Sequence, residues 1–580
     1  MLRLVALTLC LCHVTLTVQA ISLVRVTSPT SSYVGQAVTT EDGRSFHAFR
    51  GVPYAEPPVG DLRFRKPVAK PPLDGEYQAL GFKPYCIQMN YMPSSFGAGQ
   101  EDCLYLNVFT PGLRSSGQSS ELLKVLFFIH GGGNLNGFAD FYMPGSLVTH
   151  NDVIVVTINY RLGLLGFLST NSSASLGNYG LWDQVLALKW VKNNIRAFGG
   201  DPEAITVSGE SAGAIDTSVL TLCSQARGLF ARAFSMSGAT GVDHPMVLAR
   251  EPVTMAELAA RREQCLGETD PVPETDEQWA PVVECLRKVP EDRFGSMAGL
   301  GEMPLIGPVV DGDLVPNDIK NLFSDQAYLE RIGFHDKQYL VSVVHNEGSI
   351  FETMLDDMRS SMTEEQLASI PPDALFYGLI SELLKSGYGQ VSPEVVAKVA
   401  EYYQENFEVS PVADFSADSF FIIPSLEYIN AASGSANQSK AWLLRFVNFA
   451  EFMTEKNKGM CHVMDLFYLF DIDINEIKKW VDFKIDSSKW SQEDTDLKAK
   501  YGQLVSSFVK TGKPEVPKEA SGKEPPTWPP YDPVKGQYLA FSSAPSLAQH
   551  LKADRLRLFQ QQIPEWIQEF PLQPPSKEEL

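Results

Sequence analysis

The motif Gly-Glu-Ser-Ala-Gly at residues 209–213 carries the clearest chemical signal in this sequence. It follows the apolar run Ile205–Ser208 and precedes a stretch with helical periodicity, so we predict a strand, a sharp turn and a helix. Glycines on both sides of a serine permit such a turn, which projects the hydroxyl of Ser211 above the sheet. A serine in this setting is typical of a nucleophile in acyl transfer.

A second glycine-rich motif, residues 130–133 (His-Gly-Gly-Gly), directly follows the apolar run Val125–Ile129. Acyl transfer requires N–H groups that face the developing oxyanion, and glycines let a backbone come that close. We therefore predict that the N–H groups of Gly132, Gly133 and Ala212 form an oxyanion hole. The alternative is a turn that is merely flexible.

A serine hydroxyl needs a base, usually a histidine that a carboxylate orients. In the chain order serine, acid, histidine, only His462 and His550 of the nine histidines lie far enough downstream. His462 occupies a turn-like segment after a strand-like run, and we choose it as the base. His550 lies in an amphipathic stretch that we predict to be a final helix over 547–559, where a surface role fits better.

For the acid, Glu347 comes just after the apolar run Tyr339–Val344 and just before Gly348, which places it at the end of a predicted strand. We predict that Glu347 stays ionised, holds the tautomer of His462 and stabilises its cation. The alternatives are three aspartates that are more typical of turns or caps: Asp311, Asp313 and Asp465.

Continuous apolar runs predict the buried strands of a parallel sheet that must position these residues. The runs are Val125–Ile129, Val153–Ile158, Ile205–Ser208, Tyr339–Val344 and Trp442–Phe446. Helical periodicity over Leu181–Ile195, with strands alternating with helices, predicts an α/β fold with a large, mostly parallel sheet flanked by helices. Met362–Ala432 reads as a helical insertion at one edge of the sheet, which shapes an entrance.

The N-terminal segment combines Arg3, an apolar run and the small-residue ending Val18-Gln19-Ala20, so we predict a signal peptide over residues 1–20. We expect one catalytic domain over 21–570 and a polar tail over 571–580. The last residues, Lys577–Leu580, read K-E-E-L, which is close to an ER-retention signal. We expect an ER retrieval receptor as a partner and location in the ER lumen, with secretion as the alternative, and no membrane segment after cleavage.

The chain has 580 residues with 48 Lys and Arg against 70 Asp and Glu, a net charge of −22. Such an acidic chain without a basic run lacks the groups that neutralise phosphates, so nucleic acid is an unlikely class of partner.

Six cysteines remain after removal of the signal peptide, and we pair those that flank polar, loop-like stretches. The predicted disulfides are Cys86–Cys103 and Cys265–Cys285, which leaves Cys223 and Cys461 as free thiols. The N-x-[ST] sequons at Asn171 and Asn437 are predicted glycosylation sites.

Several longer motifs resemble the type-B carboxylesterase/lipase family. They are FRGVPYAEPPVGDLRF, EDCLYLNVFTP, HGGG, NYRLGLLGFL, GNYGLWDQ, AFGGDPEAITVSGESAG and GLFARAFSMSG. The resemblance covers nearly all of the mature chain. It implies an α/β-hydrolase fold, a triad at Ser211, Glu347 and His462, an oxyanion hole at Gly132, Gly133 and Ala212, and the two disulfides proposed above.

Departures from the family pattern narrow the expected substrate. The stretch between Cys86 and Cys103 has no Trp, which cholinesterases use to bind a quaternary ammonium, so choline esters fit poorly. GFLSTNSSASLGNYGL is similar to bile-salt-activated lipases, but those are expected to carry Asp where this chain has Glu347. The terminal K-E-E-L is similar to ER-lumenal carboxylesterases of the liver type.

Together these features predict a serine hydrolase that cleaves carboxylic esters through an acyl-enzyme, with a small-molecule or lipid ester as substrate and no metal or organic cofactor. One alternative is a lipase or sterol esterase acting on lipid esters. The other is a non-catalytic adhesion or binding protein on the same fold.

Overall fold

The computed structural model describes residues 22–89, 99–113, 121–241, 252–296, 306–371, 373–434, 439–448, 452, 459–472, 487–518 and 524–572. The predicted signal peptide, the sequon at Asn437 and the terminal Lys577–Leu580 lie outside these residues.

Thirteen strands of the described chain form one mixed sheet, in the order β1-β2-β3-β5-β7-β6-β8-β9-β10-β11-β12-β13, with β4 paired to β2. The strands are β1 Leu23–Thr27, β2 Ser32–Thr39, β3 Ser45–Pro53, β4 Glu76–Gln78, β5 Tyr105–Thr110, β6 Leu123–Ile129, β7 Val153–Ile158, β8 Gly200–Glu210, β9 Arg232–Met236, β10 Gln338–Val344, β11 Ala441–Phe446, β12 Gln537–Phe541 and β13 Ser546–Gln549. The run from β7 through β6 and β8 to β12 is parallel, and antiparallel strands extend it at both ends.

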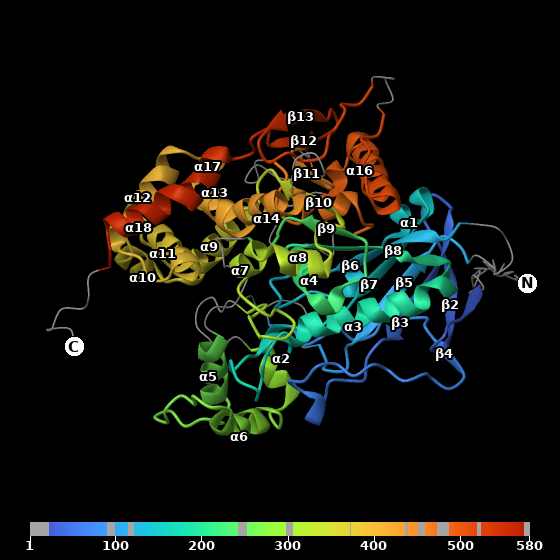
Figure 1. Ribbon diagram of the computed structural model, residues 1–580, viewed down its shortest axis with the longest axis horizontal. Coiled ribbons are helices and arrows are strands. Elements are labelled where there is room, and N and C mark those ends of the chain that lie inside the picture. Colours follow the sequence, from blue (N-terminus) through green and yellow to red (C-terminus); the bar gives the residue numbers. More distant parts are fainter. Residues whose placement is uncertain are drawn as a thin grey trace, which may run out of the picture.

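Helices flank this sheet (Figure 1). They are α1 Gly145–Asn151, α2 Gly163–Phe167, α3 Tyr179–Asn194, α4 Ala212–Leu222, α5 Pro252–Arg262, α6 Asp276–Leu286, α7 Ile319–Ser324, α8 Gln326–Ile332, α9 Ser349–Ser361, α10 Glu364–Ser369, α11 Ala374–Tyr388, α12 Pro393–Glu405, α13 Pro411–Ala417, α14 Ile423–Ser433, α16 Gln492–Thr511, α17 Ala553–Arg557 and α18 Ile563–Glu569. None of the helices in the described ranges combines the length and apolar character needed to cross a bilayer.

Alternation along the strands divides the core between the two faces of the sheet, because successive side chains of a strand point in opposite directions. In β6, Val125 and Phe127 belong to the core that includes residues of α3 and α4. Leu126 and Phe128 belong to the core that includes residues of α1 and α16. Both faces are therefore covered, which agrees with the continuous apolar runs of the central strands.

The predicted strands match the observed ones closely, and the helical reading of Met362–Ala432 is also correct. The prediction of a final helix over 547–559 is wrong at its start. Residues Ser546–Gln549 form β13, which pairs antiparallel with β12, and the helix begins only at Ala553. His550 lies between β13 and α17, is exposed and has φ of 56°. Pairing of residues 546–549 with β12 overrides the helical pattern of the sequence there.

The C-terminal helices pack against the helical segment between β10 and β11, and Figure 1 shows α17 and α18 beside α12 and α13. Arg555 of α17 makes the central contacts. It lies 3.6 Å from carboxylate oxygens of Asp414 and Asp418, and its guanidinium lies over the ring of Tyr403 at 4.3 Å. The Tyr403 hydroxyl donates to Asp418 at 2.8 Å. Helix α17 is thus joined to the helical segment through a buried ionic cluster.

Replacement of Arg555 by Met should destabilise the protein, since it removes the buried ion-pair partner of Asp414 and Asp418 and leaves Lys552 as the remaining cation near them. Loss of one partner of a buried pair costs about 3–5 kcal/mol. We expect a clear fall in the midpoint of thermal unfolding, measured at a fixed scan rate. Arg557→Met on the same helix is the control, because Arg557 is exposed. Equal midpoints for the two variants would contradict the importance of the cluster.

Candidate active site

Ser211 occupies the turn between β8 and α4, with φ of 56° and ψ of −125°. This is an unfavourable backbone conformation for a residue with a side chain. The flanking glycines have no room for one: a Cβ at Gly209 would collide with the backbone of Gly213, and a Cβ at Gly213 with the carbonyl oxygens of Ile129 and His130. The predicted strand, sharp turn and helix therefore form.

The glycine loop after β6 lies directly against this turn. A Cβ added to Gly131 would come within 2.9 Å of the Cβ of Ser211 and 2.7 Å of the carbonyl oxygen of Glu210. Gly132 and Gly133 have φ of 104° and 64°, a region that favours glycine. The structure thus brings the loop and the N-terminus of α4 together, where the N–H groups named from the sequence lie.

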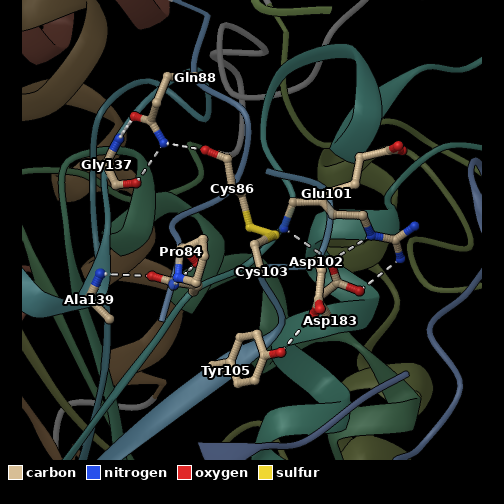
Figure 2. The surroundings of a disulfide bond; sticks show 12 residues. Pro84, Cys86, Gln88, Glu101, Asp102, Cys103, Tyr105, Gly137, Ala139 and Asp183 are labelled. Carbon is tan, nitrogen blue, oxygen red and sulfur yellow. Dashed lines mark hydrogen bonds and ion pairs between the residues drawn. A yellow bond between two sulfur atoms is a disulfide. The ribbon is translucent and has the colours of Figure 1, made fainter. Parts of the chain in front are cut away.

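Gln88, two residues beyond Cys86 of the disulfide Cys86–Cys103, contacts the end of this loop (Figure 2). Gln88 accepts a hydrogen bond from the N–H of Gly137 at 2.7 Å, and its amide donates to the carbonyl oxygens of Gly137 and Cys86 at 3.0 and 2.7 Å. The end of the glycine loop is therefore anchored to the residues beside the disulfide. The second disulfide joins Cys265 to Cys285, and Cys223 and Cys461 are free and buried.

His462 and Glu347 form a buried pair, with 2.6 Å between Nδ1 and Oε2. Glu347 follows β10 and His462 lies in the loop after β11, the parallel neighbour of β10. The two loops are also joined through Asn346, whose N–H donates to Met460 at 2.8 Å and whose carbonyl accepts from the N–H of His462 at 3.2 Å. The other oxygen of Glu347 accepts from the N–H of Val344 at 2.7 Å. Both oxygens of the Glu347 carboxylate are therefore held.

Two more side chains contact the imidazole of His462. Its Nε2 lies 3.4 Å from Oε1 of Glu210, the residue that precedes Ser211. Phe421, from a π-helical turn over Asp418–Ile422, stacks on the imidazole with 4.2 Å between ring centroids. In the described chain no hydrogen bond joins Ser211 to His462, and such bonds often form only when substrate binds.

Two further buried carboxyl groups lie near this pair. Burial, and next the charge of Glu347, raise the pKa of Glu210 well above its ordinary value. Burial raises the pKa of Asp465 in the same direction, and the charges of Glu210 and Glu347 add to the effect. Burial beside other carboxyl groups therefore shifts both Glu210 and Asp465 toward their protonated forms.

The alternatives weighed from the sequence lie in different surroundings. Asp311 accepts from the N–H groups of Asp313 and Val315, as expected for a turn residue. Asp465, by contrast, is buried beside the His462 group. His550 is exposed and lies between the end of β13 and the start of α17.

Sequence analysis missed Glu210 and Phe421 as members of this group, and it set Asp465 aside as a turn or cap residue although that side chain is buried beside His462. Glu210 had one available signal, its position inside the Gly-Glu-Ser-Ala-Gly motif. Phe421 had none, because it reaches His462 from a helical segment without a recognisable motif. Cys461 is buried, and burial raises the pKa of its thiol to about 12. Asn171 is exposed in a turn, as a glycosylation site requires.

Comparisons with known proteins agree with this geometry. A model of the carboxylesterase family matches residues 23–559. The chain is 30% identical to gut esterase 1 of Caenorhabditis briggsae over 92% of both chains. It is 31% identical to the bile salt-activated lipase of Rattus norvegicus over 91% of this chain and 83% of the relative. It is 30% identical to the acetylcholinesterase of Bungarus fasciatus over 90% of this chain and 84% of the relative.

The matched region contains the thirteen strands and all the residues of the site described above. The chain therefore belongs to the carboxylesterase family and is a carboxylic-ester hydrolase with the α/β-hydrolase fold.

Proposed function

We propose that the chain is a serine esterase in which Ser211, His462 and Glu347 act as the catalytic triad. The observation that carries the proposal is the buried 2.6 Å pair of His462 and Glu347, beside a serine held in a strained turn. A carboxylate on Nδ1 leaves Nε2 as the nitrogen that takes the proton of the serine. His550, the other histidine that we considered, makes no such contact with a carboxylate among the described residues.

In the proposed reaction, Ser211 Oγ attacks the ester carbonyl carbon while His462 accepts its proton. The N–H groups of Gly132, Gly133 and Ala212 stabilise the oxyanion of the tetrahedral intermediate. His462 then gives the proton to the departing alcohol, which leaves an acyl-enzyme, and water activated by the same histidine releases the acid.

The surroundings of His462 favour its transient positive charge. Glu347 provides the counter-charge, and the face of Phe421 attracts a cation through its π-electrons. The raised pKa values of Glu210 and Asp465 favour the neutral forms of these groups, and a neutral carboxyl group does not compete as a base.

Replacement of Ser211 by Ala should abolish hydrolysis of p-nitrophenyl acetate and butyrate, with kcat reduced by at least about 10³-fold because the nucleophile is lost. Glu347→Gln should reduce kcat by about 10³- to 10⁴-fold, since an uncharged amide no longer holds the imidazole tautomer. KM should change little. Steady-state kinetics on folded variants provide the measurement.

The residues that were weighed and set aside serve as matched controls. His550→Ala and Asp313→Asn should keep the activity of the wild-type protein, and so should Ser224→Ala, an exposed serine in the turn that follows α4. Full activity of Ser211→Ala, or loss of activity in His550→Ala, would reject the proposed triad.

A lipase or sterol esterase is the second candidate, and the similarity to a protein named bile salt-activated lipase favours it. The two candidates share the same triad and differ in acyl chain length. A higher kcat/KM for p-nitrophenyl palmitate than for the acetate would favour the lipase, and the opposite order would favour a carboxylesterase.

We also propose that residues 1–20 direct the chain into the secretory pathway, that Lys577–Leu580 retain it in the ER lumen, and that Asn171 and Asn437 carry glycans. Support comes from the sequence pattern and from the two disulfides, which persist in oxidising compartments.

Deletion of residues 577–580 should move the full-length protein from the cell to the medium of secretory host cells. The control is a protein in which Lys577 and Glu578 exchange places, because this change keeps the charge and composition of the tail. Treatment with an endoglycosidase should lower the apparent mass, and Asn171→Gln and Asn437→Gln should each remove one step. Equal retention with and without the tail would contradict the ER assignment.

A further inference from the structure

A buried carboxyl group, Asp216, lies on α4 one helical turn beyond Ala212 and has no role in the reaction described above. It accepts hydrogen bonds from two amides. Gln184 Nε2 on α3 donates to Oδ2 at 2.6 Å, and Asn134 Nδ2 donates to Oδ1 at 3.3 Å. All three side chains are buried. The contact with Asn134 is the informative one, because it leads to the glycine loop.

Asn134 directly follows Gly133 and continues the left-handed backbone of the loop, with φ of 57°. Its side-chain oxygen lies 3.1 Å from the hydroxyl of Tyr160, which is also 2.9 Å from the carbonyl oxygen of His130. Its own carbonyl accepts from the N–H of Gly163 at 2.7 Å. The amide of Asn134 is therefore held on one side by Tyr160 and faces Asp216 on the other.

The proposed oxyanion donors come from two separate pieces of chain. Gly132 and Gly133 belong to the loop after β6, and Ala212 begins α4. Stabilisation of an oxyanion requires that such donors keep their relative positions to within about 0.5 Å. The hydrogen bond between Asn134 and Asp216 spans these two pieces, one residue beyond Gly133 and one turn beyond Ala212.

We propose that Asn134 and Asp216 are positioning residues, whose hydrogen bond holds the glycine loop against α4 in the arrangement that the oxyanion requires. This inference rests on the proposed function, because it assumes that Gly132, Gly133 and Ala212 donate to the oxyanion.

The electrostatics of Asp216 support a bonding role rather than one as a fixed charge. Burial raises its pKa to about 7, although the hydrogen bonds from Gln184 and Asn134 lower it. The neutral amide of an asparagine has a similar shape and still offers an oxygen to Asn134. Asp216→Asn is therefore a conservative variant that keeps the contact.

Asn134→Gly tests the proposal most directly, because glycine tolerates the positive φ while the amide is lost. We expect kcat for p-nitrophenyl butyrate to fall about 10- to 100-fold with KM within about twofold, since the loss is felt in the transition state. Asp216→Leu should behave in the same way, and Asp216→Asn should keep most of the activity. Thr217→Val is the matched control, because Thr217 is the buried neighbour of Asp216 on α4 and its hydroxyl has no hydrogen-bond partner among the residues that the structure describes.

A trifluoromethyl ketone inhibitor separates positioning from a general loss of structure. Ser211 Oγ adds to its carbonyl carbon, the serine proton passes to His462, and the carbonyl oxygen becomes an oxyanion like that of the intermediate. The inhibition constant of Asn134→Gly should rise by the same factor by which kcat/KM falls. Unchanged kcat, or a fall in kcat without weaker inhibition, would overturn the proposal.

The double variant Asn134→Gly/Asp216→Leu completes the test. Two residues that act through one hydrogen bond give a double variant no slower than the slower single variant. Multiplied effects would show that they act independently and would reject the proposal. If Asp216→Leu does not fold, the kinetics and inhibition of Asn134→Gly still decide. Failure of the proposed function is recognised separately, by an active Ser211→Ala variant.

Discussion

The sharp turn between β8 and α4 is the constraint on which the rest of the site depends. It holds Ser211 at a positive φ, a conformation that costs of order 1–3 kcal/mol unless the surroundings enforce it. Gly209 and Gly213 lack side chains, so the backbone before the turn can pack directly against the backbone after it. Gly213 also lies against the carbonyl groups at the end of β6. The close contact at Gly213 brings the glycine loop beside the serine, so the strained turn and the loop form one packed unit.

Parallel pairing of the central strands brings Glu347 and His462 together. The carboxyl ends of β8, β10 and β11 lie at one edge of the sheet. Glu347 follows β10, and His462 lies in the loop after β11. Because both residues are buried, their 2.6 Å contact is shielded from water and strengthened. The same burial forces Glu210 and Asp465 toward their protonated forms. Glu347 therefore contacts the histidine, while the pKa values of its two neighbouring carboxyl groups are raised.

Segments far from the motifs complete the surroundings of the histidine. Phe421 reaches His462 from the helical segment between β10 and β11. The π-helical turn that carries Phe421 begins at Asp418, which Arg555 and Tyr403 contact. Helix α17 thus supports, through one buried cluster, the helical turn that packs on the histidine.

The sequence by itself determined the central strands and the turn at Ser211, and it predicted the pairing of Glu347 with His462, because apolar runs, glycine spacing and chain order can be read without a structure. Only the tertiary structure decided features that join distant segments. Residues 546–549 became a strand through pairing with β12, against their helical pattern. The contacts of Phe421 with His462 and of Asn134 with Asp216 depend on how folded segments meet, and the raised pKa of Glu210 depends on burial. Periodicity and motif spacing carry no information about such distances or about exclusion of water.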